Sequence, residues 1–346
     1  MIRVVPPSGF AKPGIRNLLL LLLAAAAFCC ACGRGRKVLE IAYVSAPQVY
    51  LRDHVAAVYN KTGTVRNGDR VQVLERERRF VRVRTDSGAE GWLEQRYLVS
   101  QEVYESFQKL ASQEKDDPIQ ATGTTRNDTN LHVEPGRETE HLYLLEQGTK
   151  VSVLKRATAE KTLPGGLPRP ASQNQKAESQ SQGTAMEDWW LIRDPQGHAG
   201  WVLERMVDLD VPLEIAQYAE GQRIVAFFVL DEVTDGDKKV AQYLVALTEP
   251  KDGMSFDYNQ VRVFTWNVKR HRYETAYRER LNGVLPVVVS HESFDKEGML
   301  PVFVLRIEDD AGNVTERKYK LNTPIVRRVL APGEQAQKTI ARKKRR

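Results

Sequence analysis

The chain has 346 residues, enough for two or three domains, and its 28% charged and 41% hydrophobic residues are typical of folded globular proteins. The formal charge of +6 comes from the two ends. Residues 1–31 hold three cations and residues 338–346 hold six, both without an acid, and the rest of the chain has 42 Lys and Arg against 45 Asp and Glu. Because the basic charge does not belong to the folded body, we predict no nucleic-acid partner.

The N-terminal stretch has the layout of a secretory signal peptide. Three cations precede an unbroken apolar run from Leu18 to Phe28, which is too short to span a bilayer. All three cysteines of the chain follow within four positions, in an order that resembles a bacterial lipobox. Ala31 is the small residue that the lipobox places before its modified cysteine, so we expect lipidation of Cys32, with Cys30 as the alternative. The resemblance implies an exported protein, anchored by acyl chains to a membrane of the cell envelope on its periplasmic or outer side.

Two segments of the chain repeat one pattern. Residues 67–76 match residues 147–156 at an offset of 80, and residues 88–93 match residues 197–202 at an offset of 109. Both copies alternate apolar and polar residues in short runs separated by glycine turns, which predicts small antiparallel sheets. The larger second offset is explained by an insertion. Residues 157–187 are rich in Pro, Gly, Gln and Ser, and we expect a disordered loop.

The repeated pattern resembles the bacterial Src-homology-3-like (SH3b) family. The first copy carries the pattern in five elements: Leu51-Arg52, Asn67-Gly68-Asp69, Phe80, Gly91-Trp92 and Tyr97-Leu98. The second copy departs from it at His132, Gln147-Gly148-Thr149 and Met206-Val207. The resemblance implies two small β-barrels, over residues 38–100 and 121–210. It also implies that they bind cell-wall peptides or other peptide ligands and do not catalyse a reaction.

The remaining segments are interpreted from their patterns. Residues 101–117 form a linker in which apolar residues recur at helical spacing, so a helix is predicted from Gln101 to Lys115. Residues 212–330 predict a β-sandwich-like domain of about seven strands. Its predicted strands are Ile224–Val233, Val240–Thr248, Val261–Trp266, Tyr273–Glu279, Val284–Ser290, Pro301–Ile307 and Val314–Leu321. Residues 331–346 are predicted to be a basic disordered tail. The predicted fold class is therefore all-β.

No catalytic or metal-binding constellation is recognisable in the sequence. The six histidines do not pair at metal-ligand spacing, and the nucleophile, phosphate-loop and zinc-protease motifs are missing. Papain-like wall peptidases often accompany such modules, but they need a nucleophilic cysteine and none follows Cys32. We therefore predict a protein that is not an enzyme and uses no metal and no cofactor.

Three aromatic residues are candidates for ligand binding. Phe80 and Trp189 occupy equivalent positions in the two copies, on the strand face opposite Val81 and Trp190. If the valine side is the core, these rings face a groove, although a cap at the barrel end fits the pattern equally well. Tyr97 joins them through the family resemblance alone.

These features predict a non-catalytic binding or scaffold protein of the envelope. Its partner would be a cell-wall peptide or another envelope protein, and a lipid anchor would hold it at the membrane. Two alternatives remain open: an enzyme with an unrecognised active site in residues 212–330, and a structural spacer without a small ligand. The sequence gives no prediction of the oligomeric state.

Overall fold

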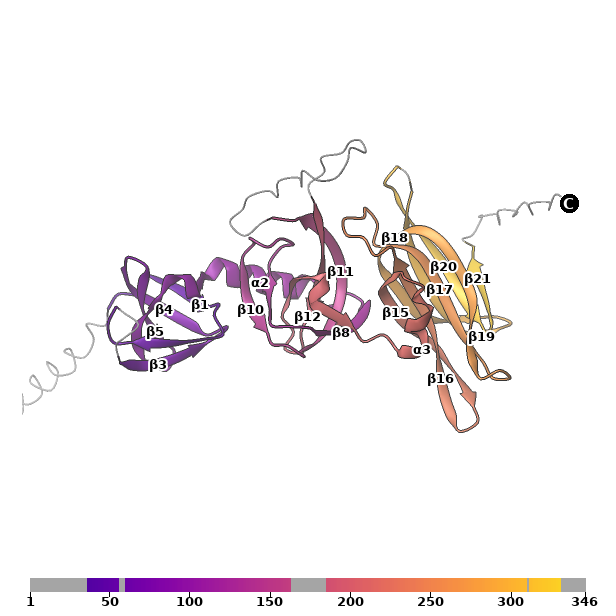
Figure 1. Cartoon of the computed structure of the whole chain (residues 1–346), viewed down its shortest axis with the longest axis horizontal. Coiled ribbons are helices and arrows are strands. Elements are labelled where there is room, and N and C mark those ends of the chain that lie inside the picture. Colours follow the sequence, from indigo (N-terminus) through magenta and orange to yellow (C-terminus); the bar gives the residue numbers. More distant parts are fainter. Residues whose placement is uncertain (1–35, 56–59, 163–184, 310, 331–346) are drawn as a thin grey trace, which may run out of the picture.

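The computed structural model describes residues 36–55, 60–162, 185–309 and 311–330. These residues form three antiparallel sheets of seven strands each, which follow one another along the long axis of the molecule (Figure 1). The prediction of an all-β fold is confirmed. The signal peptide, Cys30, Cys32 and the tail 331–346 lie outside the described residues. The described part of the chain contains no helix with the length and apolar composition that a membrane crossing requires.

The first sheet rolls around a core of its own and is called the first barrel below. Alternate strand residues point inward, and the buried set includes Leu51, Val73, Val81 and Leu93. Its strands are β1 (Glu40–Val44), β2 (Gln48–Arg52), β3 (Lys61–Arg66), β4 (Arg70–Glu77), β5 (Phe80–Thr85), β6 (Glu90–Glu94) and β7 (Leu98–Ser100), with the 3-10 helix η1 (Gln95–Tyr97) before the last strand. The strand order is β3-β2-β6-β5-β4-β1-β7.

The second sheet, called the second barrel, has the same strand order shifted by seven: β10-β9-β13-β12-β11-β8-β14. The sequence repeat is therefore a repeat of topology. Its elements are β8 (Ala121–Thr125), β9 (Thr129–His132), β10 (His141–Leu145), β11 (Lys150–Glu160), β12 (Met186–Arg193), β13 (Ala199–Leu203), η2 (Glu204–Met206) and β14 (Val207–Leu209).

The insertion in the second barrel begins later than the sequence predicts. Strand β11 continues to Glu160 and β12 starts at Met186, and Ala157 pairs with Trp189 inside this hairpin. Both ends of the predicted loop 157–187 are thus strand, because they extend the ladder of a hairpin whose inner face is apolar. Residues 163–184 lie outside the described residues.

A glycine precedes a tryptophan in both barrels because two strands approach too closely there for a side chain. A Cβ on Gly91 would lie 2.7 Å from Leu51 Cβ and 2.5 Å from Thr62 Oγ1. A Cβ on Gly200 would lie 2.7 Å from Leu131 Cβ. Both positions mark the approach of β6 to β2, or of β13 to β9, that closes each barrel.

Helix α2 (Gln101–Gln113) joins the two barrels, in the region where the sequence predicts a helix. The Tyr104 ring of α2 stacks on Tyr43 of the first barrel at 3.9 Å. Asn67 also bridges the barrels, because its amide donates to the Leu142 carbonyl at 2.7 Å and accepts from Leu144 N–H at 3.1 Å. The family-type Asn-Gly-Asp turn is therefore a joint in this chain.

The third sheet is an up-and-down meander, β15 to β21 in sequence order, so its seven strands lie in one sheet where a sandwich would have two. The strands are β15 (Arg223–Asp235), β16 (Lys238–Thr248), β17 (Tyr258–Asn267), β18 (Arg272–Phe294), β19 (Gly298–Glu308), β20 (Val314–Asn322) and β21 (Ile325–Val329). Two predicted strands merge into the long β18, and β21 is a strand that the sequence does not predict. The short helices α3 (Leu213–Ala216) and η3 (Gln217–Ala219) precede β15, the first strand of this sheet.

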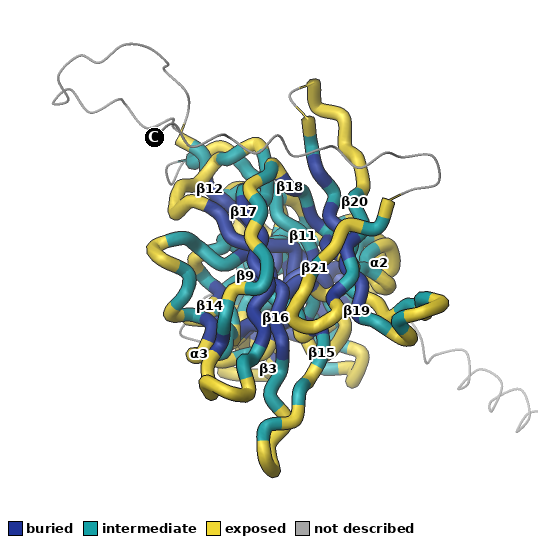
Figure 2. The backbone as a smooth tube through the Cα atoms, turned by 90° about the vertical axis from the view of Figure 1, so that its right-hand side faces the viewer, coloured by how far each residue is buried: buried dark blue, intermediate teal, exposed yellow. Residues whose placement is uncertain are grey.

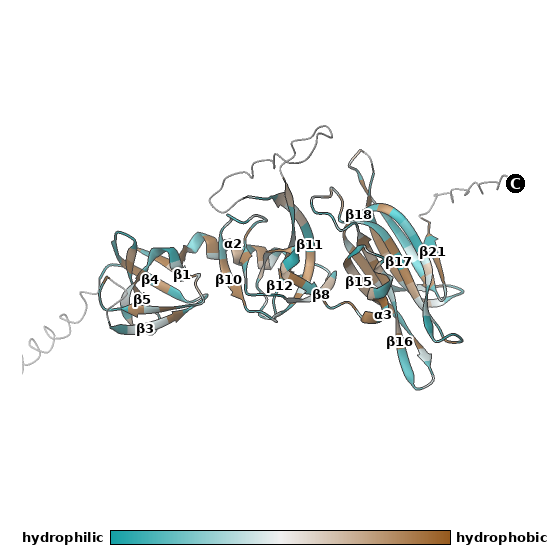
Figure 3. Ribbon diagram, in the orientation of Figure 1, coloured by the Kyte–Doolittle hydropathy of each residue, from teal (hydrophilic) through white to brown (hydrophobic). Residues whose placement is uncertain are grey.

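The second barrel and the third sheet share one hydrophobic core. Buried residues of both, such as Val153 and Val225, belong to the same cluster. The carboxamide of Gln120 donates to the Val287 carbonyl at 3.2 Å and accepts from Val287 N–H at 2.8 Å, although 167 positions separate the two residues. Burial follows the strand centres while turns are exposed (Figure 2). In the third sheet, β15 is largely apolar, whereas β20, which lies beside β21, is largely hydrophilic (Figure 3).

Candidate functional site

The first barrel carries an open groove between β2, β5, β6 and η1. Its volume is about 340 Å³. Four aromatic side chains line it, together with the turn before β2 and a few polar residues: Tyr50, Phe80, Trp92 and Tyr97, with Ala46, Pro47, Gln48, Val49, Arg52, His54, Leu93 and Glu94. Aromatic walls beside a proline-containing turn form an amphipathic surface that suits peptides and sugar rings.

Backbone pairing fixes where these rings lie. Phe80 pairs with Glu94 at the start of β5, and Trp92 pairs with Arg52 across β6 and β2. Tyr97 ends η1, and its carbonyl accepts from Ser45 N–H at 2.9 Å, which ties it to the turn before β2. The groove is therefore built on strands and a short helix and not on a free loop.

The aromatic side chains differ in exposure. Tyr50 is 38% exposed, and Phe80 and Tyr97 are half-buried, whereas Trp92 is only 7% exposed. Trp92 thus forms the floor of the groove, and the other three rings form its walls. The three wall rings are therefore partly accessible to a ligand.

Cationic side chains lie over each of the three wall rings. Lys61 Nζ is 3.4 Å from the centre of the Tyr50 ring, Arg79 Cζ is 5.2 Å from that of Phe80, and Arg96 Cζ is 4.9 Å from that of Tyr97. Arg96 also donates to the Tyr97 hydroxyl at 2.9 Å and pairs with Glu94 at 2.8 Å. These three cations flank the wall rings without lining the groove itself, and they are called the rim of the groove below.

The equivalent position in the second barrel is closed. Trp189 is only 1% exposed and packs edge-on against the His132 ring, 5.3 Å away. Beside it on the same face of β12, the carboxylate of Glu187 accepts from Arg137 at 2.6 Å and from Arg205 at 3.0 Å. Trp189 is thus covered, and we remove this residue from the candidate binding set. Asn130 and Met206 stand where the first barrel has Tyr50 and Tyr97.

The environment of Trp189 fixes the protonation states of Glu187 and His132. Burial opposes ionisation of Glu187, but the hydrogen bonds from Arg137 and Arg205 outweigh it and lower the pKa of that carboxyl. Burial and the neighbouring His141 lower the pKa of His132 to about 4. At neutral pH the pair Glu187–Arg137 is therefore charged and His132 is neutral, a combination that keeps Trp189 covered.

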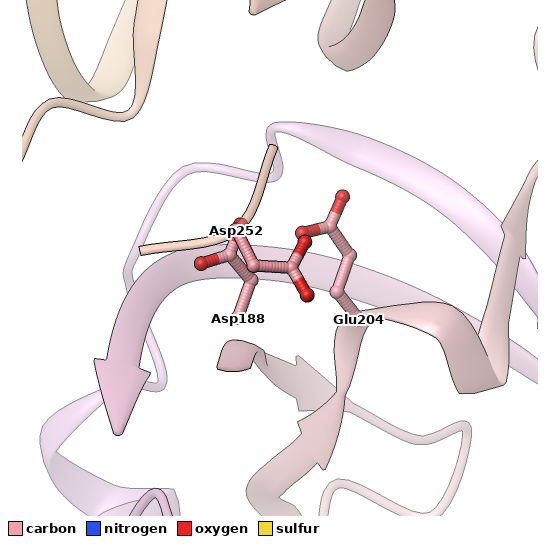
Figure 4. A group of neighbouring side chains, drawn as sticks. All are labelled: Asp188, Glu204 and Asp252. Atoms are coloured by element: carbon pink, nitrogen blue, oxygen red, sulfur yellow. The ribbon is translucent and has the colours of Figure 1, made fainter. Parts of the chain in front are cut away.

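A second cavity, of about 440 Å³, lies where the second barrel meets the third sheet. Three carboxylates converge there, and their nearest oxygens lie within 4.8 Å of one another: Asp188, Glu204 and Asp252 (Figure 4). Burial is the main cause that raises the pKa of Glu204, to about 7. Such a group of carboxylates is a cation site only if no protein cation already occupies it.

Arginine already neutralises this cluster. Arg223 donates to Glu204 at 2.8 Å, to Asp188 at 3.2 Å and to Asp252 at 3.0 Å. Arg156, itself buried, donates to Asp188 at 2.7 Å. Since the guanidinium of Arg223 contacts all three carboxylates, we interpret the cluster as an ion-paired joint between two units of the fold.

The site residues predicted from the sequence do not all lie in one site. Phe80 and Tyr97 lie together in one groove, Trp189 is buried in another barrel, and Cys32 and Cys30 lie outside the described residues. Tyr50, Trp92 and the cations of the rim are functional candidates that the sequence analysis does not predict. For Tyr50, the aromatic residue in a strand next to the family-type Leu51-Arg52 is a usable signal.

Comparison with known proteins supports the first barrel as a recognised module. Residues 48–99 match the bacterial SH3 domain model, and this range contains every aromatic residue of the groove. The family resemblance predicted from the sequence is confirmed over this range, and it points to a role at the cell wall. Membership of the second barrel in the same family stays a prediction, supported by the shared strand order. No curated protein matches the chain.

Solved structures similar to the chain are NlpC/P60-type proteins. NlpC1 from Trichomonas vaginalis is 9% identical, with 83% of this chain and 90% of that chain covered and a TM-score of 0.18. NlpC2 from the same organism is 10% identical, with 85% and 97% covered and a TM-score of 0.17. An NlpC/P60 family protein from Bacillus cereus is 10% identical, with 82% and 95% covered and a TM-score of 0.23.

The prediction that the chain is not an enzyme is wrong on this comparison. The finding that stands against it is the match to NlpC/P60-type proteins. The sequence-based argument rested on the missing cysteine nucleophile, which excludes one chemistry and not others. With TM-scores of 0.17 to 0.23, the likeness assigns no catalytic role to any residue of this chain.

Proposed function

We propose that this chain is a cell-wall-binding protein whose first barrel holds a wall peptide in its aromatic groove. The observation that carries the proposal is the open groove with walls of Tyr50, Phe80 and Tyr97, inside the range that matches a bacterial SH3 domain. Aromatic residues in such positions usually dominate peptide binding. The second barrel, with Trp189 covered, serves in this proposal as the joint to the third sheet.

Binding of the mature full-length chain to purified wall sacculi tests the proposal. Phe80→Ala and Tyr97→Ala should each weaken retention about tenfold or more, as expected for groove aromatics. Phe294→Ala is the matched control, because Phe294 is half-buried under Lys320 on the third sheet, as Phe80 is under Arg79. Retention that is equal for wild type and both groove variants, with unchanged melting temperatures, would reject the groove as the binding site.

We also propose that acyl chains on Cys32 anchor the protein in the envelope. The support is the apolar run Leu18–Phe28 followed by the small residue Ala31 before the cysteine. Intact mass spectrometry of the protein extracted from membranes should show acyl mass on a chain that begins at Cys32. Cys32→Ala should move the protein from the membrane fraction to a soluble exported fraction. A mature wild-type chain without acyl mass contradicts this proposal.

A further inference from the structure

The groove of the first barrel is distinguished by its cations. The described residues contain five pairs in which a Lys or Arg lies over an aromatic ring, and four of them lie at this groove. Two of the four, Lys61 at 3.4 Å and Arg52 at 6.0 Å, share the Tyr50 ring. Cations held against the walls of a groove present their charge to whatever fills it.

Several other arginines of the first barrel pair with carboxylates. Glu90 pairs with Arg36, Arg82 and Arg84, and Asp86 pairs with Arg70. At the groove, by contrast, Glu94 is the single Asp or Glu among the lining residues, and it pairs with Arg96. Lys61 and Arg79, which lie over the Tyr50 and Phe80 rings, form no ion pair with any described carboxylate.

A surplus of positive charge is also present in the composition of the first barrel as a whole. Residues 36–100 contain 12 Lys and Arg against 8 Asp and Glu, a balance of +4, whereas residues 101–330 contain 29 against 36, a balance of −7. An anionic ligand is therefore attracted to the first barrel and repelled by the rest of the folded body. This difference in charge favours approach of the ligand to the groove.

We propose that the groove selects an acidic peptide, with carboxylates placed against Lys61 and Arg79 while its apolar parts lie on Phe80 and Trp92. This inference rests on the proposed function and gives the chemical class of the wall peptide. An ammonium or guanidinium group forms short, charge-assisted hydrogen bonds with a carboxylate, and these are stronger than bonds between neutral groups. A neutral peptide would meet the same aromatic walls but would form no ion pair with Lys61 or Arg79.

Binding of two defined probes to the full-length chain tests the selection. The probes are soluble wall peptides released from sacculi, with their carboxyl groups intact or converted to amides. The wild type should bind the intact peptides at least tenfold more tightly than the amidated ones. Raising the salt concentration from 0.05 to 0.5 M should weaken only the binding of the intact peptides, because it shortens the Debye length severalfold.

Variants locate the selecting charges. Lys61→Gln combined with Arg79→Gln should remove most of the preference for intact over amidated peptides. Arg76→Gln is the matched control, since Arg76 is an exposed arginine of the same barrel that pairs with Glu40, and it should keep the preference. Melting temperatures of all variants identify any loss of the fold.

The outcomes separate this inference from the proposed function. Equal affinity for intact and amidated peptides, with binding still lost in Phe80→Ala, overturns the acidic selection and leaves the groove as a peptide site. Binding of neither probe, together with sacculus retention that ignores Phe80, overturns both. Tight binding of wall phosphate polymers but not of intact peptides would show that the cations recognise a different anion, and it would also overturn the inference.

Discussion

At the residue scale, the same strand position has opposite environments in the two barrels. Phe80 lines an open groove under Arg79, whereas Trp189 is covered beside the Glu187–Arg137 pair. The difference arises from neighbours distant in the sequence, since Arg137 comes from the loop between β9 and β10. Two barrels of equal topology thus differ at this position because one carries the Glu187–Arg137 ion pair beside it and the other does not.

Glu204 is a second residue whose environment has measurable consequences. Burial raises the pKa of this carboxyl to about 7, against an ordinary value of 4.5. Below pH 4.5 the group is protonated in both the folded and the unfolded chain. Between pH 4.5 and 7 only the unfolded chain releases the proton, so the folded state loses stability as the pH rises through this window.

We predict that Glu204→Gln removes this loss. At pH 8 the variant should be more stable than the wild type by on the order of 1 to 3 kcal/mol, and the difference should vanish near pH 4.5. A glutamine can still accept from Arg223, and its amide can donate to Asp188 while Arg156 and Asp252 keep their contacts. Denaturant unfolding of both proteins from pH 4.5 to 8 measures the effect.

The control for this prediction carries the opposite sign. The hydrogen bond from Arg262 lowers the pKa of the exposed Glu220, so Glu220→Gln should not gain stability at pH 8. Parallel pH profiles of wild type and Glu204→Gln would show that the Glu204 carboxyl is ionised in the folded protein, against the prediction.

At the element scale, the sequence predicts most of the strands but not how some of them join. The sequence-based strands Tyr273–Glu279 and Val284–Ser290 are one strand, β18, with Gly283 between them. A Cβ on Gly283 would lie 2.1 Å from Tyr258 Cε2, so this glycine admits the ring of the neighbouring strand and does not make a turn. A contact across two strands decides this point, and no local pattern contains that information.

The same limit applies to the groove. Strand alternation and the family motif are enough to identify Phe80 and Tyr97 as candidates. Tyr50 and Lys61 become part of the site only because β2 lies beside β6 and β3 in the closed barrel. The burial of Trp189 likewise depends on the ion pairs of Glu187 with Arg137 and Arg205. These partners lie 50 and 18 positions away in the sequence, and residue type alone does not predict the pairing.

At the scale of the whole molecule, the three units are coupled to different extents. The first barrel has a hydrophobic core of its own, whereas the second barrel and the third sheet share theirs. Arg156 adds polar contacts between the second barrel and the third sheet. It donates from β11 to the carbonyls of Met254 and Phe256 at 3.3 and 3.1 Å and pairs with Asp257 at 3.3 Å. The second barrel and third sheet should therefore unfold as one cooperative body.

We predict that Arg156→Met destabilises that body by up to about 3 to 5 kcal/mol, the usual cost of breaking a buried ion pair. Arg156 is 4% exposed and Asp188 is 1% exposed, so the aspartate would keep only Arg223 as a counter-charge, and Asp257 would lose Arg156. Thermal unfolding should show a lower transition for the second barrel and third sheet together. Hydrogen exchange should accelerate in β12 and in β16–β17, and the first barrel should keep its protection.

Arg126→Met provides the comparison that separates a buried pair from a surface one. Arg126 pairs with Asp208, and both side chains are more than half exposed, so the change should cost no more than about 1 kcal/mol. If Arg156→Met accelerates exchange in β12 but leaves β16–β17 at wild-type protection, the two units are independent. In that case the joint around Asp188 stabilises the second barrel alone and does not transmit its stability to the third sheet.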